Sequence, residues 1–284
     1  MKIKVGSRES KLAVIQSEII INSIRADYPD INIELITMKT TGDRILDRTL
    51  DKIGGKGLFV KELDRALSEG RVDITVHSLK DMPVEENDRL PVVAYSKREN
   101  PFDALVLPEG KSDIQGPIGC ASSRRAVQLK KLYPELEVKP VRGNVLTRLN
   151  KLDSGEYGAL VLACAGLERL GLSERISRVF DENEMLPAAG QGIIAVQGRA
   201  GEDFSYLEGT DCYESRVCAA AERAFIKELN GGCSSPAAAF AKTENGMLVL
   251  KGMNVIDGKL RFDSMQGDCG EAETIGRNLA WRLR

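Results

Sequence analysis

One cysteine stands at the tip of a glycine-rich turn, in the stretch Asn230-Gly231-Gly232-Cys233-Ser234-Ser235-Pro236. The two glycines allow positive φ and a sharp bend, and the serines and the proline oppose a regular helix or strand. A thiol in such a turn is accessible, so Cys233 could carry a large covalent group. The alternative is an ordinary tight turn in which the cysteine is merely a small apolar residue.

A hydroxyl, a cation and a carboxylate lie within a second turn, where Ser78, Lys80 and Asp81 directly follow a predicted strand over residues 72–76. In open α/β sheets, ligands bind beyond the carboxyl ends of the strands. Because His77 is the single histidine of the chain, acid–base chemistry is expected to fall to Asp, Glu, Lys or His77. Asp81 is the best candidate for proton transfer or for stabilising a cation. The alternative is a surface Lys–Asp pair, worth under about 1 kcal/mol.

Arginines recur after three successive predicted strands of the middle of the chain. They are Arg124 and Arg125, then Arg142 and Arg148, then Arg169. A planar guanidinium binds a carboxylate through two parallel hydrogen bonds, so a row of them suits a polycarboxylate ligand. The alternative is a set of helix-end arginines that pair with nearby glutamates.

Two further segments could bind anions. Arg8 follows the first predicted strand, and Ser7 or Ser10 can cap the next helix, whose N-terminus favours anions. The glycine-rich segment around residues 52–57 carries Lys52 and Lys56. Such a segment is expected to form a mobile loop that closes over an acidic ligand.

Composition sets the frame for these candidates. The chain has 284 residues, 42% of them hydrophobic and 29% charged, which is typical of a globular protein of two or three domains. A net charge of -2 argues against a dedicated nucleic-acid binder. There is no apolar run long enough for a membrane span and no signal-peptide pattern at the N-terminus, so a cytoplasmic location is expected. The six cysteines form no Cys-x-x-Cys pair, so neither a metal site nor a disulfide framework is expected.

The order of predicted elements indicates an α/β protein with two β/α lobes and a small C-terminal α+β domain with a three-stranded antiparallel sheet. The chain crosses between the lobes near residues 96–101 and again near residues 186–192. A strand over residues 193–197 then returns to the first lobe. The expected domains are residues 1–96 with 192–210, residues 97–191, and residues 211–284.

Several motifs, taken in order, resemble those of the porphobilinogen deaminase (hydroxymethylbilane synthase) family over nearly the whole chain. They are Arg8-Glu9-Ser10-Lys11-Leu12-Ala13, Gly54-Gly55-Lys56-Gly57-Leu58-Phe59, His77-Ser78-Leu79-Lys80-Asp81-Met82-Pro83, Arg142-Gly143-Asn144-Val145, the stretch 187–192, and Gly231-Gly232-Cys233 with Pro236.

The resemblance implies lobes built like those of periplasmic binding proteins. It implies a dipyrromethane cofactor attached to Cys233 through a thioether and made from the enzyme's own substrate. The implied reaction joins four porphobilinogen molecules head to tail with loss of ammonia, and water then frees hydroxymethylbilane. A monomer is also implied.

The resemblance further implies a role for each candidate residue. Asp81 would be catalytic, stabilising positive charge near the pyrrole nitrogens and moving protons. The residues implied to bind the cofactor are Cys233, Lys80, Ser122, Arg124, Arg125, Arg142 and Arg148. The residues implied to bind substrate are Arg8, Ser10, Arg169, Ser78, Lys52, Lys56 and Gln191. The run Ala121-Ser122-Ser123 departs from the family pattern, which weakens the assignment of Ser122.

Two other functions remain open from the residues. A non-catalytic anion- or solute-binding protein would also have two lobes and two crossings. A cysteine-nucleophile hydrolase would need His77 as the base beside Cys233. The missing signal-peptide pattern and a third domain that carries an exposed cysteine count against the binding protein, and His77 is the only imidazole available to the hydrolase.

Overall fold

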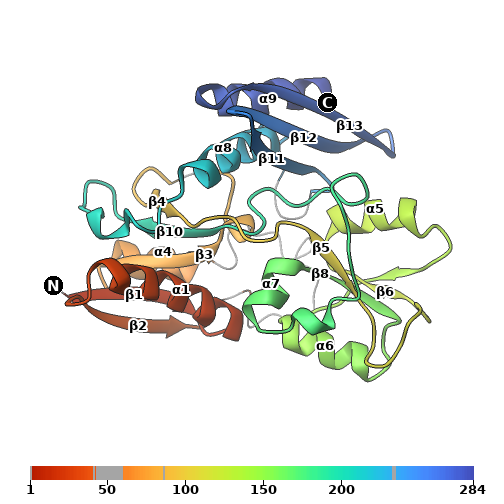
Figure 1. Cartoon of the computed structure of the whole chain (residues 1–284), viewed down its shortest axis with the longest axis horizontal. Coiled ribbons are helices and arrows are strands. Elements are labelled where there is room, and N and C mark those ends of the chain that lie inside the picture. Colours follow the sequence, from red (N-terminus) through yellow and green to blue (C-terminus); the bar gives the residue numbers. More distant parts are fainter. Residues whose placement is uncertain (1, 41, 43–59, 86, 232–234) are drawn as a thin grey trace.

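The computed structural model describes residues 2–40, 42, 60–85, 87–231 and 235–284. Figure 1 shows three units: one lobe at the left, a second lobe at the right, and the C-terminal unit above both. Each unit is built on its own sheet. Among the described helices, none is both long and apolar enough to cross a membrane.

The first lobe has a five-stranded sheet in which four strands come from the N-terminal third of the chain. In spatial order the strands are β2 (Asn32–Met38), β1 (Lys2–Arg8), β3 (Ile74–Ser78), β10 (Ile194–Gly198) and β4 (Val92–Tyr95). β1 runs parallel to β2 and β3, whereas β10 runs antiparallel to β3 and β4. The predicted return strand therefore sits inside the first sheet and not at its edge.

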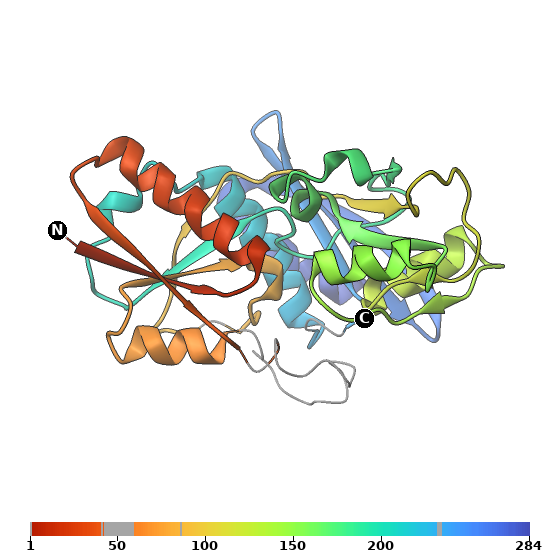
Figure 2. The same ribbon diagram turned by 90° about the horizontal axis from the view of Figure 1, so that it is seen from below.

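Helices cover both faces of this first sheet (Figure 2). On one side, Ile20 and Ile24 of α1 (Lys11–Asp27) are fully buried against strands β1 and β3, as their spacing of four residues predicts. On the other side lies α4 (Lys61–Ser68). The apolar spacing of Leu63, Ala66 and Leu67 predicts a helix over residues 58–69, which α4 confirms over its described part, and residues 58 and 59 lie outside the described part of the chain.

The second lobe repeats the same sheet pattern. Its strands, in spatial order, are β7 (Val138–Lys139), β6 (Ile118–Gly119), β8 (Ala159–Ala163), β5 (Asp103–Val106) and β9 (Arg178–Val179). Its helices are α5 (Ser123–Leu132), α6 (Val145–Asp153) and α7 (Cys164–Arg169). In both lobes the fourth strand is antiparallel and directly follows a crossing between the lobes. Two such lobes give the periplasmic-binding-protein-like architecture, which confirms the predicted fold class.

The C-terminal unit is an antiparallel meander covered by two helices. Its elements are α8 (Tyr213–Glu228), β11 (Ala238–Glu244), β12 (Met247–Ile256), β13 (Lys259–Asp268) and α9 (Ala272–Arg282). The two hairpin turns, 245–246 and 257–258, have positive φ at both central residues, which is why Asn-Gly and Asp-Gly occur there. Phe225 of α8 and Leu279 of α9 are fully buried between the helices and the sheet. The predicted three-stranded sheet is confirmed.

The two crossings between the lobes run side by side. The amide of Ser96 donates to the carbonyl of Ile194, and the amide of Glu99 donates to the carbonyl of Gly192. Gly192 has φ of +90°, and a Cβ there would lie 2.4 Å from the Glu99 carbonyl oxygen, so the pairing requires glycine.

A buried glutamate of the C-terminal unit joins both crossings. Glu222 on α8 accepts hydrogen bonds from both terminal nitrogens of Arg98, at 2.8 and 3.0 Å, and from the amide of Gly190 at 2.6 Å. It also accepts from the amide of Ala241 in β11 at 2.7 Å. One fully buried carboxylate therefore ties the first crossing, the second crossing and the C-terminal sheet together.

Candidate active site

The turn that carries Lys80 and Asp81 is held in place by its neighbours. The strand β3 ends at Ser78, and a single 3₁₀ turn over Leu79–Asp81 follows. The side chain of Leu79 is buried, and its amide donates to the carbonyl of Ile193 at 3.0 Å. Lys80 and Asp81 are both partly exposed. The sequence correctly predicts that this turn follows a strand of the first sheet.

Lys80 is linked across the lobes through Gln191. Its ammonium donates to Gln191 Oε1 at 3.3 Å, and Gln191 Nε2 donates to Asp103 Oδ1 at 2.9 Å and to the carbonyl of Pro101 at 2.6 Å. Gln191 is buried in the second crossing. The side-chain amide of Gln191 therefore connects the turn of the first lobe to the start of the second lobe.

Asp103 holds the paired arginines of α5. Arg124 Nη1 donates to Asp103 Oδ2 at 2.7 Å, while Arg125 donates to Oδ1 through Nε at 3.0 Å and Nη2 at 2.7 Å. Ser122 is the N-cap of the helix, and its side chain accepts from the amide of Arg125. Ser122 thus positions the helix that carries both guanidiniums.

Arg148 on α6 extends this cationic group. Its Nε donates to the carbonyl of Gly143 at 2.8 Å. Burial lowers the pKa of Arg148 to about 10, the charges of Arg125 and Arg142 act in the same direction, and Asp81 opposes them. Burial likewise lowers the pKa of Lys80 to about 8, against the opposing charge of Asp81. These cationic side chains therefore interact electrostatically, and Asp81 acts on both Lys80 and Arg148.

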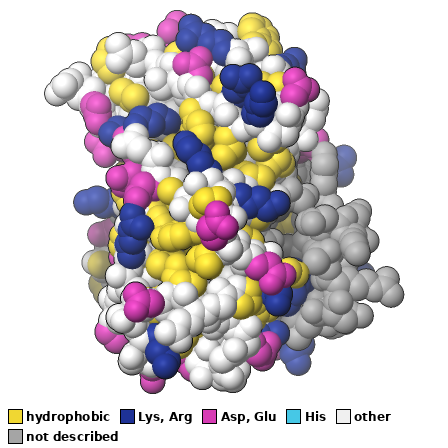
Figure 3. Space-filling view, turned by 90° about the vertical axis from the view of Figure 1, so that its right-hand side faces the viewer, with side chains coloured by type: hydrophobic (Ala, Val, Ile, Leu, Met, Phe, Trp, Pro, Cys, Tyr) yellow, Lys and Arg dark blue, Asp and Glu magenta, His cyan; other side chains and the backbone are white. Residues whose placement is uncertain are grey.

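The paired arginines of α5 are buried and are not part of an exposed basic patch. On the side of the molecule seen in Figure 3, which is the right-hand side of Figure 1, lysines and arginines are interspersed with acidic and apolar side chains. Arg124 and Arg125, in contrast, are 4% and 6% exposed. Positive charge gathers where the second lobe meets the turn of the first, beside Asp81.

The candidates near the N-terminus lie on β1, β3 and α1. Ser10 is the N-cap of α1, and its side chain accepts from the amide of Ala13 at 3.4 Å. Ser78 is hydrogen bonded to Gln16 at 2.8 Å. Arg8 ends β1, and its charge acts on His77.

His77 itself is a buried residue. Its Nε2 lies 2.9 Å from Thr75 Oγ1. Burial and then the charge of Arg8 lower the pKa of His77 to about 4. His77 is therefore neutral near pH 7 and is 6% exposed, which is a poor setting for a general base.

Arg169 contacts both crossings. Its Nε is 2.7 Å from Glu99 Oε2, and its Nη2 donates to the carbonyl of Gly192 at 2.7 Å. The sequence predicted one row of arginines after three strand ends. In the structure, Arg124, Arg125, Arg142 and Arg148 form one electrostatically coupled group, and Arg169 joins the two crossing segments. Lys52, Lys56 and Cys233 lie outside the described residues.

Sequence analysis missed two residues that organise this region. Asp103 is fully buried, and Gln16 pairs with Ser78. A signal for Asp103 was available, because an acidic residue that precedes the apolar run Ala104-Leu105-Val106-Leu107 at the start of a buried strand needs a cationic partner. Gln16 gave no comparable signal, because a glutamine on a helix is usually solvated.

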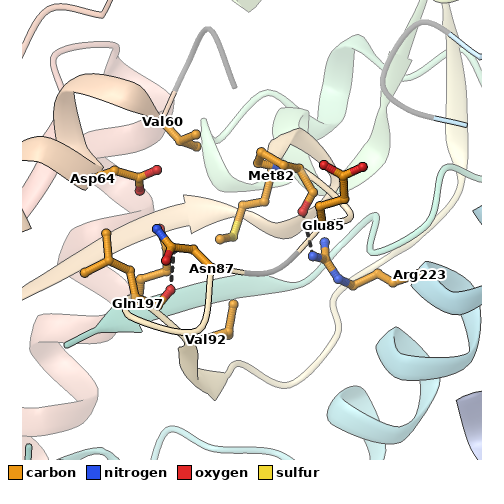
Figure 4. Close-up of a pocket in the computed structure, with 10 residues that line it drawn as sticks. Val60, Asp64, Met82, Glu85, Asn87, Val92, Gln197 and Arg223 are labelled. Carbon is orange, nitrogen blue, oxygen red and sulfur yellow. Dashed lines mark hydrogen bonds between the residues drawn. The ribbon is translucent and has the colours of Figure 1, made fainter. Parts of the chain in front are cut away.

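A small pocket lies on the other side of the 80–83 turn, between the first lobe and α8 (Figure 4). Arg223 of α8 donates to the carbonyl of Pro83 at 2.6 Å, which ties the end of the turn to the C-terminal unit. Asp64 also lines the pocket, and its Oδ1 is buried with no hydrogen-bond partner among the described residues. Burial raises the pKa of Asp64 to about 6.

Asp64→Asn is expected to stabilise the protein at neutral pH. A carboxyl whose pKa is raised by folding loses stability as pH rises from the unfolded value of about 3.9 through the folded value, because the buried carboxylate is desolvated. After discounting for partial exposure, the gain above pH 7 is about 1 kcal/mol, or roughly 2–4 °C in Tm. Thermal unfolding at pH 5 and pH 7.5 checks this, and the gain should be larger at pH 7.5. The exposed Asp113→Asn is the matched control, and an equal gain at both pH values would contradict the assignment.

The fold and the site together define a class: a two-lobed protein with a cluster of cationic side chains where the lobes meet, and with crossings that contact a third unit. The comparisons with known proteins then specify the family. Residues 3–206 match the family model described as "Porphobilinogen deaminase, dipyromethane cofactor binding domain", and residues 216–284 match "Porphobilinogen deaminase, C-terminal domain". The chain belongs to the porphobilinogen deaminase family.

Relatives of this family align over the whole chain. The porphobilinogen deaminase of Acetivibrio thermocellus is 60% identical and is aligned over 100% of this chain and 98% of its own. That of Chromobacterium violaceum is 46% identical, over 99% of this chain and 94% of its own. Among solved structures, the Methionine Binding Protein, MetQ, is 14% identical with a TM-score of 0.47, over 74% of this chain and 88% of that one.

Proposed function

We propose that this chain is a hydroxymethylbilane synthase, which joins four porphobilinogen molecules head to tail with release of ammonia. The observation that carries the proposal is the group of cationic side chains beside Asp81, of which Arg124 and Arg125 are buried. Within the described part of the chain, this group has five cationic side chains and two carboxylates. They are Lys80, Arg124, Arg125, Arg142 and Arg148, with Asp81 and Asp103. Every porphobilinogen unit carries two carboxylates, which this excess can neutralise.

The dipyrromethane cofactor of the family fits these residues. Burial, and then the charges of Arg125 and Arg142, lower the pKa of Arg148, which supports a site that gains stability from a bound anion. The carboxylate side chains of a dipyrromethane would supply that negative charge. We assign Lys80, Arg124, Arg125, Arg142 and Arg148 to hold it, with Ser122 capping the helix. When bound, the cofactor supplies a covalent primer on which the chain of pyrroles grows.

The remaining roles are proton transfer, charge stabilisation and substrate binding. We assign Asp81 to stabilise positive charge on a pyrrole nitrogen and to take up the proton that the new carbon–carbon bond displaces. Lys80 binds carboxylate as an ammonium. Arg8, Ser10, Ser78, Arg169 and Gln191 are assigned to the incoming substrate or the growing chain. Lys52 and Lys56, which lie outside the described residues, are assigned to the same role.

We further propose that the three sheets correspond to three domains with the boundaries 1–96 plus 192–210, 97–191, and 211–284. The membership of β10 in the first sheet supports the discontinuous first domain. A monomer in the cytoplasm that binds no nucleic acid is consistent with a net charge of -2 and with a small-molecule substrate.

Intact-mass measurement tests the function directly. Protein purified from cells that make porphobilinogen should carry a covalent adduct of two pyrrole units, and the adduct should be absent from Cys233→Ser. Cys269→Ser is the control, because Cys269 is a partly exposed free cysteine of the same unit. Unmodified wild-type protein that leaves porphobilinogen unchanged would favour the non-catalytic solute-binding alternative.

A further inference from the structure

Asp103 is a carboxylate of the site that accepts several hydrogen bonds. It is fully buried at the start of β5 and accepts hydrogen bonds from three side chains, those of Arg124, Arg125 and Gln191. Burial by itself would raise the pKa of Asp103, but the two guanidiniums outweigh it and hold the pKa below its usual range. Asp103 is therefore ionised throughout the working pH range.

The carboxylate fixes the orientation of both guanidiniums. Arg124 Nη1 is shared between Asp103 Oδ2 and the carbonyl of Leu186, both at 2.7 Å. Arg125 donates twice to Asp103 Oδ1 and once to the carbonyl of Val161, at 3.0 Å. A planar guanidinium held at two places has little freedom to rotate, so its orientation is set before any ligand arrives.

Asp103 also acts on Lys80, which lies in the other lobe. Gln191 accepts from Lys80 and donates to Asp103, which makes a hydrogen-bonded connection from the 79–81 turn to β5. Electrostatically, Asp103 and Asp81 raise the pKa of Lys80, while burial, Arg125 and Arg124 lower it. The two carboxylates thus help to keep Lys80 cationic near neutral pH.

We infer that Asp103 is a positioning residue for this reaction, which sets the geometry of Arg124 and Arg125 and, through Gln191, the position and charge of Lys80. Its complete burial keeps it away from substrate, so it acts through these side chains. The inference rests on the proposed function and adds to it a residue on which the cations of both lobes depend.

The test compares Asp103→Asn with wild type and with Asp113→Asn, an exposed aspartate of the same lobe. The fraction of protein that carries the two-pyrrole adduct is read by intact mass, and turnover of porphobilinogen by the loaded fraction is measured from pH 6 to pH 9.5. For Asp103→Asn we expect a smaller loaded fraction and a KM raised about tenfold, with a smaller change in kcat. The alkaline limb of kcat/KM should move down by roughly one pH unit, because Lys80 loses a neighbouring negative charge.

A folded Asp103→Asn protein with wild-type loading, KM and alkaline limb would overturn the inference. So would a loss confined to kcat, because that pattern does not indicate misplaced ligand-binding cations. If Asp103→Asn does not fold, Asp103→Glu carries the test. It keeps the charge but displaces it by one methylene, so a wild-type KM would count against the inference and a raised KM would support it. A wild-type protein without adduct or turnover would instead overturn the proposed function, and the inference with it.

Discussion

Asp81→Asn should retain the covalent two-pyrrole adduct and yet lose nearly all turnover, by about 10²–10⁴-fold. Asparagine keeps the shape of the side chain but can neither accept the displaced proton nor balance a positive charge on a pyrrole nitrogen. The adduct should persist because Arg124 and Arg125 are held by Asp103 and not by Asp81. Intact mass and product formation, measured on the same preparation, separate the two effects.

The matched control is Asp88→Asn, which removes an exposed carboxylate seven residues along the chain. Asp88→Asn should turn over porphobilinogen like wild type. A wild-type rate for Asp81→Asn would remove Asp81 from the assigned role. Loss of the adduct from Asp81→Asn would show instead that Asp81 acts mainly in holding the cofactor.

Glu222→Ala should be the most destabilising single change, at about 3–5 kcal/mol. The substitution leaves the largely buried Arg98 without its carboxylate and leaves the amides of Gly190 and Ala241 without an acceptor. A loss of this size lowers Tm by roughly 10 °C in a protein of this length. Thermal unfolding with calorimetric or circular-dichroism detection measures it.

Two comparisons sharpen this second prediction. Glu222→Gln keeps an acceptor oxygen and should lose less stability than Glu222→Ala. Arg98→Ala combined with Glu222→Ala should cost less than the two single changes together, because each removes the same ion pair. A Tm within 2 °C of wild type for Glu222→Ala would show that the three units are held together by other contacts.

The sequence predicts elements best where the signal is local. The spacing of Ile20 and Ile24 predicts one buried helix face, Asn245-Gly246 and Asp257-Gly258 predict two turns, and the apolar run over residues 193–197 predicts the return strand. The Lys80–Asp81 turn was predicted because both residues directly follow a strand. The segment 138–141 predicts a strand of four residues, but β7 has only two, because the sequence gives no sign of where strand pairing stops.

The partners of buried charges could not be predicted in the same way. Gln191 and Asp103 are 88 residues apart in sequence, and Arg98 and Glu222 are 124 apart. The local sequence can indicate that Asp103 needs a partner, but only the folded chain shows which residues meet. The same limit applies to the grouping of the arginines. Their positions after strands predicted a shared edge of the sheet, but their contacts with Asp103 and with the crossings could not be predicted.

The place of β10 also has a consequence for synthesis on the ribosome. β4 pairs only with β10 in the described sheet, and β10 lies between β3 and β4 although it follows the whole second sheet in sequence. A nascent chain that has emerged only as far as β4 therefore cannot complete its first sheet. We expect the second lobe to fold first, because its segment of the chain is continuous. The first sheet should remain incomplete, with one edge of β3 unpaired, until residue 198 leaves the ribosomal tunnel.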